Sequence, residues 1–133
     1  MADDAEVLLP DPFARGFGER GWQPRPHQLA LLDLAGGGRS CLLIAPTGAG
    51  KTLAGFLPSL VDVTHNEVKR KPGAARGSAR RGIHTLYISP LKALAVDIER
   101  NLATPVAEMG LPVSIETRTG DTPASKRQRQ KRN

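Results

Sequence analysis

The chain has 133 residues, a net charge of +6 and only 4% aromatic side chains. This length suits a single domain, whose core must be built mainly from Ala, Leu, Ile and Val. The sequence has no apolar run of about 18 residues and residues 1–6 are acidic, so we expect neither a membrane span nor an export signal, and a cytoplasmic, nucleoid-associated location.

The basic charge is concentrated in two segments of the chain. Residues 66–82 and residues 118–133 each carry a net charge of +5, which leaves −4 on the remainder. Basic segments on an otherwise acidic body favour a polyanionic partner such as nucleic acid. For residues 66–82 alone, a solvated, flexible surface loop without such a partner is an equally good interpretation.

The beginning of the chain predicts a lead-in and one short helix. Residues 1–16 contain two prolines and are expected to form a loose lead-in segment. Pro26 can serve as the first residue of a helix over residues 27–34, which stops at the three glycines of residues 36–38. Three aromatic side chains are expected to anchor the lead-in on the domain: Phe13, Phe17 and Trp22.

Apolar runs alternate with helical patterns along the rest of the chain. The runs predicted to be strands are residues 40–45, 83–88 and 113–118. The first run contains Cys41, the single cysteine, which we expect to be buried and which excludes an internal disulfide. The helix that follows has an apolar stripe beginning at Leu53, and Pro58 within it predicts a kink or an early end.

Further helices are expected after the second and third runs. One has its apolar face over residues 91–102, a separate short helix covers residues 105–110, and a last helix opens at Pro123 with Thr122 as its cap. Strands that alternate with helices predict an α/β fold, in which a parallel sheet carries helices on both faces.

Residues 45–52 join the first predicted strand to the helix that follows it. They read Ala-Pro-Thr-Gly-Ala-Gly-Lys-Thr, close to the phosphate-binding pattern G-x-x-x-x-G-K-[ST], with Ala45 in place of the first glycine. Glycines let main-chain N–H groups surround phosphates, and the helix N-terminus and Lys51 add positive charge. The Thr52 hydroxyl is suited to coordinate Mg²⁺. The predicted triphosphate site comprises Ala45, Pro46, Thr47, Gly48, Ala49, Gly50, Lys51 and Thr52.

Two more polar clusters follow predicted strands, at residues 89–92 and 118–122. The carboxyl ends of parallel strands lie along one edge of a sheet, so both clusters are expected on the same rim as the phosphate loop. One nucleotide does not require two additional clusters, and the sequence therefore predicts a second ligand.

Four segments together resemble the motifs of superfamily 2 helicases. Residues 21–28 resemble the adenine-reading Q motif, residues 45–52 motif I, residues 89–94 motif Ia and residues 118–122 the motif Ib region. The stretches YISPLKALAVDIERNL and ETRTGDTPASKRQRQ are most similar to the large helicase-related (Lhr) group, in particular its bacterial ligase-associated DNA-damage-response DExH-box helicases.

The resemblance implies that residues 17–133 form part of a RecA-like P-loop domain, cut before the DExH box. It implies a site for ATP and Mg²⁺ in which Arg25 and Gln28 contact the nucleotide, Gln28 by pairing its amide with adenine. Lys51 and Thr52 would be the catalytic pair, Lys51 on the β- and γ-phosphates and Thr52 on Mg²⁺. The residues implied to lie along one nucleic-acid strand are Pro90, Lys92, Arg118, Thr119, Gly120 and Thr122.

The implied activity is that of an ATP-dependent nucleic-acid helicase or translocase linked to DNA repair. Single-stranded or partly duplex DNA is favoured over RNA as the partner, beside a DNA ligase or nuclease system. The printed sequence has no Asp-Glu pair of the DExH type and no second RecA-like domain, so this chain alone is expected to bind weakly and not to unwind. The alternative is a nucleic-acid-binding module that does not use ATP. Asp121 and the three histidines are given no catalytic or metal-binding role.

Overall fold

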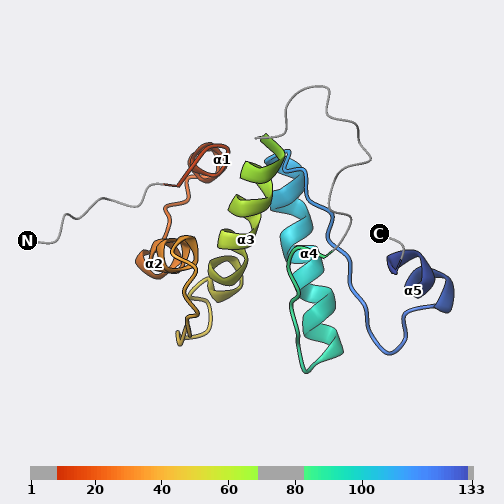
Figure 1. The fold of residues 1–133 in the computed structure, drawn as a ribbon. Helices are drawn as coiled ribbons and strands as arrows, with labels where there is room; N and C mark the ends of the chain where they lie inside the picture. The colour runs from red at the N-terminus through yellow and green to blue at the C-terminus, as the bar shows by residue number, and fades with distance from the viewer. Residues whose placement is uncertain (1–8, 69–82, 132–133) are drawn as a thin grey trace, which may run out of the picture.

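The computed structural model describes residues 9–68 and 83–131, which contain five α-helices and no β-strand. The helices are α1 (Phe13–Glu19), α2 (Pro26–Gly36), α3 (Lys51–Val68), α4 (Lys92–Glu108) and α5 (Ala124–Gln130). Figure 1 shows α1 and α2 on one side of α3, α4 on its other side, and α5 beyond α4. Among the described residues, no helix has the length and apolar character that crossing a membrane requires.

The apolar core lies where α1, α3 and the end of α4 meet. Its buried members are Leu9, Phe13, Phe17, Leu57, Leu60, Val61, Val106 and Leu111. Gly16 allows α1 to approach the end of α4, because a Cβ atom at this position would lie 2.6 Å from the Met109 side chain.

Two of the three predicted aromatic anchors are buried in this core. Phe13 and Phe17 stand one helical turn apart on α1, and Trp22 packs edge-on against Phe17 at a ring separation of 6.0 Å while half exposed. Helix α1 therefore begins inside the segment interpreted as a lead-in, because its two phenylalanines share a buried face. Residues 1–8 lie outside the described part of the chain.

Helix α2 begins at Pro26, as predicted, and packs against α3. The predicted stripe of α3 is confirmed, with Leu57 and Leu60 buried. The helix continues through Pro58 instead of ending early. An interior proline costs about 3 kcal/mol, whereas each fully buried leucine contributes about 1.5–3 kcal/mol. Burial of Leu57 and Leu60, on either side of Pro58, therefore outweighs the cost of the proline.

Helix α4 is one continuous helix, and the prediction of a separate helix over residues 105–110 is wrong. Pro105 lies within α4, and Leu102 and Val106 on either side of it are both buried. The same balance of burial against proline strain keeps the helix intact. The helix ends at Glu108, before the predicted end at Gly110, and Gly110 follows it with a left-handed φ of +61°.

The three runs predicted as strands do not form strands in the part of the chain that the structure describes. Leu42 is 83% exposed and Ile88 is 80% exposed, so neither has the neighbours that a buried strand requires. The expected burial of Cys41 is wrong for the same reason, since this cysteine is exposed. A strand needs a partner for its ladder hydrogen bonds. The parallel sheet therefore remains a prediction.

Residues 83–88 lie against α3 even though they do not form a strand. His84 Nε2 is 2.7 Å from the Asp62 carboxylate, and the Phe56 and Tyr87 rings are 5.2 Å apart. Of the predicted basic loop, residues 66–68 belong to α3 and residues 69–82 lie outside the described residues.

Candidate nucleotide and nucleic-acid sites

The phosphate loop, defined here as residues 45–50, leads directly into α3, whose first residue is Lys51. Gly48 and Gly50 have positive φ angles of +81° and +73°, which glycine adopts without steric cost. A Cβ atom at Gly50 would also lie 2.9 Å from Nε2 of Gln28. Glycine is therefore required at Gly50 both by the backbone angle and by the close approach of α2.

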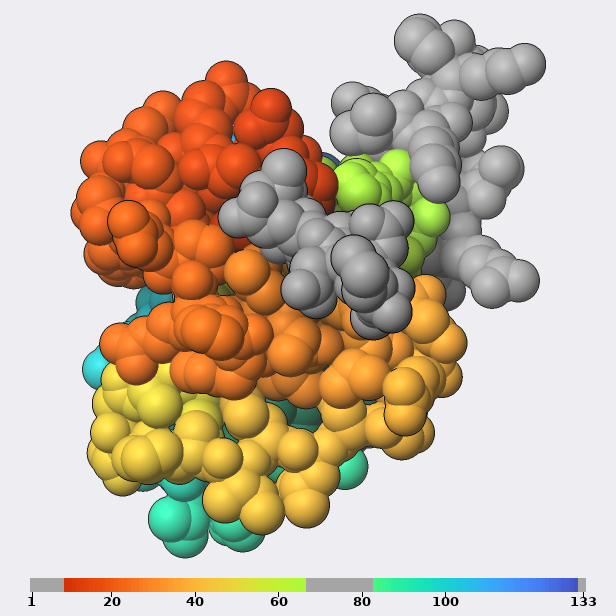
Figure 2. Space-filling model, turned by 90° about the vertical axis from the view of Figure 1, so that its left-hand side faces the viewer, coloured from red at the N-terminus to blue at the C-terminus, as the bar shows by residue number. Residues whose placement is uncertain are grey.

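The first turn of α2 holds the phosphate loop from one side. Three side chains contact three successive main-chain oxygens: Arg25 Nη1 to Gly48 at 3.1 Å, His27 Nε2 to Ala49 at 2.7 Å and Gln28 Nε2 to Gly50 at 3.4 Å. Figure 2 shows the result on the surface, where the yellow loop lies directly against the orange α2.

These contacts set the direction of the loop's N–H groups. In a trans peptide the C=O and the following N–H point in opposite directions. The Ala49 oxygen faces His27 of α2, so the N–H of Gly50 faces away from α2. The Gly50 oxygen accepts from Gln28 and also from the N–H of Ala54 at 3.0 Å within α3, so the N–H of Lys51 points away from both. The N–H of Ala49 is used within the loop, where it donates to Pro46 at 3.2 Å. The loop thus presents main-chain donors at the N-terminus of α3.

Gln28 is 3% exposed, and both ends of its amide have partners in the protein. Its Oε1 accepts the N–H of Arg25 at 2.9 Å, which caps α2, and its Nε2 donates to Gly50. The structure therefore places Gln28 and Arg25 between α2 and the phosphate loop. Contact of either side chain with adenine remains a prediction.

The Lys51 ammonium group lies against its own loop. Its Nζ donates to the main-chain oxygens of Ala45 at 2.6 Å and of Pro46 at 2.8 Å. Pro46, Thr47 and Thr52 are exposed around it. Lys51 and Thr52 also border a pocket of about 310 Å³, whose other lining residues are Gly55, Phe56, Thr85, Leu86 and Tyr87.

Residues 119–122 form a tight turn before α5, named here the 119–122 turn. The N–H of Thr122 donates to the main-chain oxygen of Thr119 at 3.2 Å, and the N–H of Thr119 donates to Oγ1 of Thr122 at 2.8 Å. The prediction that Thr122 caps the last helix is wrong, because its hydroxyl accepts this bond from Thr119 and the N-cap residue of α5 is Pro123, which has no side-chain cap.

An ion pair joins the 119–122 turn to the start of α4. Lys92 contacts the Asp121 carboxylate, and the two side chains are 58% and 72% exposed. The structure therefore brings together the two polar clusters predicted at residues 89–92 and 118–122. Asp121, to which the sequence assigns no chemistry, is paired with a lysine predicted to contact nucleic acid.

The candidate sites share one end of the molecule. In Figure 1 the N-terminal ends of α3 and α4 and the turn that precedes α5 all lie at the lower end of the view, with α4 between the phosphate loop and the turn. Of the other residues predicted to contact nucleic acid, Pro90, Arg118 and Gly120 are exposed. The placement of two ligands along this end remains a prediction.

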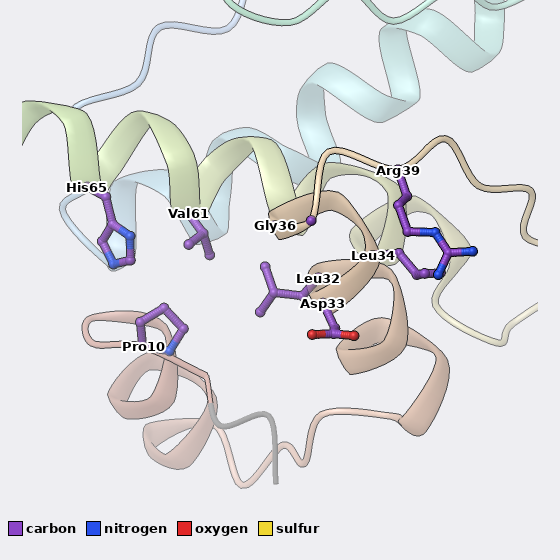
Figure 3. Close-up of a pocket in the computed structure, with 9 residues that line it drawn as sticks. Pro10, Leu32, Asp33, Leu34, Gly36, Arg39, Val61 and His65 are labelled. Carbon is purple, nitrogen blue, oxygen red and sulfur yellow. The ribbon is translucent and has the colours of Figure 1, made fainter. Parts of the chain in front are cut away.

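A separate pocket of about 540 Å³ lies between α2, α3 and Pro10. Figure 3 shows Leu32 of α2, Val61 and His65 of α3, and Pro10 turned toward this common space. Its lining includes none of the residues predicted to bind nucleotide or nucleic acid.

Comparison of the sequence with known proteins shows the family of this chain. The chain belongs to the DEAD/DEAH box helicase family, whose model matches residues 25–133. Domains of this family have the RecA-like fold, so the chain carries part of such a domain.

Among curated proteins, the chain resembles several helicases of the Lhr type. It is 43% identical over 78% of its length to the Lhr helicase/ probable uracil glycosylase of Mycolicibacterium smegmatis, and 39% identical over 100% of its length to the Lhr helicase/uracil glycosylase of Escherichia coli. It is 35% identical over 96% of its length to the ATP-dependent helicase Lhr-Core of Sulfolobus acidocaldarius. The chain spans 7%, 10% and 14% of these relatives' own lengths. No solved structure matches it significantly.

Proposed function

We propose that this chain carries the ATP-binding and strand-contacting part of an ATP-dependent nucleic-acid helicase or translocase. The main support is the set of hydrogen bonds between α2 and the phosphate loop. With the loop held in this way, the N–H groups of Gly50 and Lys51 point away from α2 at the start of α3. Donors at a helix N-terminus beside a lysine fit the negative charge of a triphosphate. Membership in the DEAD/DEAH box helicase family supports the same function.

In this proposal ATP and Mg²⁺ bind at residues 45–52. The Lys51 ammonium leaves the oxygens of Ala45 and Pro46 and contacts the β- and γ-phosphates, while the Thr52 hydroxyl coordinates Mg²⁺. Arg25 and Gln28 contact the base end of the nucleotide, and Gln28 Nε2 gives up its 3.4 Å contact with the Gly50 oxygen to do so. Mg²⁺ neutralises phosphate charge when it is bound, and the chain's own contribution is to orient the phosphates against main-chain donors.

The second ligand in this proposal is one strand of nucleic acid. Its backbone contacts Pro90, Lys92, Arg118, Thr119, Gly120 and Thr122, which position the strand without reading its sequence. Single-stranded or partly duplex DNA is the favoured partner, and DNA binding would place the protein at the nucleoid. The resemblance to ligase-associated helicases supports a role beside a DNA ligase or nuclease in repair. The predicted strands would pair into the parallel sheet of a RecA-like domain.

The test is a calorimetric titration of the 133-residue chain with Mg·ATP. Charged hydrogen bonds contribute about 1.5–3 kcal/mol each, so Lys51→Ala should weaken binding by at least about tenfold. Lys92→Ala, which removes an equal charge outside the phosphate loop, should leave ATP affinity unchanged. No heat with the unaltered chain, or equal affinity for the unaltered chain and Lys51→Ala, would reject the nucleotide site.

A nucleic-acid-binding module that does not use ATP is the second candidate. It is favoured by the two hydrogen bonds with which Lys51 closes its own loop, since these must break before a triphosphate can bind. Strand binding that is indifferent both to Mg·ATP and to Lys51→Ala would support this function over the first.

A further inference from the structure

We propose that Arg127 is a positioning residue, which fixes the 119–122 turn in the shape that binds a nucleic-acid strand; this inference rests on the proposed function. Arg127 Nε donates to the main-chain oxygen of Thr122 at 2.8 Å, and Nη2 donates to that of Thr119 at 3.1 Å. Nη2 also contacts the main-chain oxygen of Gly120. One guanidinium group thus holds three of the four carbonyls in the turn.

The geometry gives the turn a donor side and an acceptor side. The oxygens of Thr119 and Gly120 face the guanidinium, so the N–H groups of Gly120 and Asp121 face away from it. A strand phosphate is an anion and accepts hydrogen bonds from such N–H groups. Arg127 therefore acts behind the turn, where its Nε and Nη2 donors are directed at carbonyls. The charge of this segment alone would instead count it among the phosphate contacts.

Helix α5 depends on polar contacts to present Arg127 to the turn. It has no buried residue. Two other contacts attach it to the preceding segment: Gln130 Nε2 donates to the Thr117 oxygen at 3.3 Å, and Arg129 lies 3.1 Å from the Glu116 carboxylate. Because the core is formed elsewhere, substitutions on α5 should change the turn without unfolding the chain.

Arginine suits this role better than lysine. A guanidinium carries five N–H donors in a fixed planar fork, whereas an ammonium group has three donors at a single point. Three carbonyls that converge on one side chain match the fork. We therefore expect Arg127→Lys to hold the turn and support strand binding only in part.

The experiment compares three variants of the full chain by fluorescence anisotropy with a labelled oligodeoxythymidine at several salt concentrations. Arg127→Gln should weaken binding by about five- to tenfold without changing the dependence of log K on log salt. Arg118→Gln, which removes an exposed predicted phosphate contact, should reduce that slope by about 0.7. Lys131→Gln removes the same charge from the exposed residue that ends α5, away from the turn, and measures the effect of net charge alone.

Amide hydrogen exchange of Thr119 and Thr122 provides a readout that needs no nucleic acid. Both amides are hydrogen-bonded within the turn. Their exchange should accelerate in Arg127→Gln, accelerate less in Arg127→Lys and stay unchanged in Lys131→Gln. Far-UV circular dichroism should be the same for all variants.

The outcomes separate this inference from the proposed function. If the unaltered chain does not bind the oligonucleotide, the proposed strand site fails, while amide exchange still decides whether Arg127 holds the turn. Unchanged exchange in Arg127→Gln, or a slope reduced as much as in Arg118→Gln, would overturn the positioning role. Faster exchange with unaltered strand affinity would overturn the link between turn shape and binding.

Discussion

The imidazole of His27 and the main-chain oxygen of Ala49 lie 2.7 Å apart, which joins the first turn of α2 to the middle of the phosphate loop. A carbonyl can only accept, so Nε2 of His27 carries the proton in this contact. The residue that stands beside the predicted adenine reader Gln28 is thus part of the support of the phosphate loop.

His27→Ala is expected to weaken Mg·ATP binding. The loss of one hydrogen bond costs about 0.5–1.5 kcal/mol, or roughly two- to twelvefold in Kd, because the Ala49 peptide becomes free to rotate. Calorimetric titration measures the effect, and His65→Ala, at an exposed histidine of α3, is the matched control. Equal ATP affinity for the two variants would show that the contact is not needed for binding.

Gly50→Ala is expected to damage the phosphate loop more severely. The new Cβ would lie 2.9 Å from Nε2 of Gln28, and the φ of +73° is strained for any residue with a side chain. Strain of this kind costs about 1–3 kcal/mol, so both the melting temperature and the ATP affinity should fall.

Gly55→Ala is the matched control for that substitution. Gly55 lies inside α3 and has nothing within 4 Å of its ideal Cβ position. Alanine in a helix interior is favoured over glycine by about 0.5–1 kcal/mol, so this variant should melt at a higher temperature. If Gly50→Ala were as stable as Gly55→Ala, the close packing of α2 on the loop would be disproved.

The sequence predicted those features of the fold that depend on local pattern. The apolar stripe of α3 and the glycine-lysine pattern before it identified the helix and the loop, because both are set by residues near one another in the chain. The strands were not found in the described residues, since a strand also needs a partner far away in the sequence. Local strain predicted a kink or an early end at Pro58 and a new helix at Pro105, but both helices continue through their prolines because burial outweighs the strain.

The sequence predicted which residues would contact the ligands, but not the residues that hold the two ligand loops in place. Lys51 and Lys92 follow from motif positions, whereas the roles of His27 and Arg127 arise only when the backbone brings carbonyls to them. Both candidate ligand loops are built alike, since donors on a neighbouring helix take the loop's oxygens and leave its N–H groups facing the other way. A polar side chain in the first turns of a helix beside such a loop is the signal that could have identified them.

Asp121→Asn is expected to strengthen strand binding. Asp121 pairs with Lys92, and a pair of exposed side chains contributes only about 0–1 kcal/mol, so a phosphate can displace the carboxylate. Removing its charge frees Lys92 and ends the repulsion of phosphate, and the affinity for oligodeoxythymidine should rise several-fold at low salt.

Asp97→Asn tests whether that gain is local. Asp97 is an exposed residue of α4, and its replacement changes the net charge by the same amount. A gain in affinity for Asp121→Asn that is no larger than the gain for Asp97→Asn would mean that net charge alone is responsible. Lys92→Gln should lower the affinity, and in that background Asp121→Asn should have a smaller effect.

The purified 133-residue chain is expected to associate with itself through its exposed apolar runs. Leu42 is 83% exposed and Ile88 is 80% exposed, in segments whose backbone forms no strand in the described structure. Unpaired backbone next to exposed apolar side chains favours pairing with a second copy. Sedimentation equilibrium should show association that increases with concentration, and the double variant Leu42→Lys with Ile88→Lys should reduce it. The control variant Ala103→Lys with Ala107→Lys adds the same charge at exposed positions of α4 and should not reduce association. If both double variants reduced association equally, the effect would be due to charge alone.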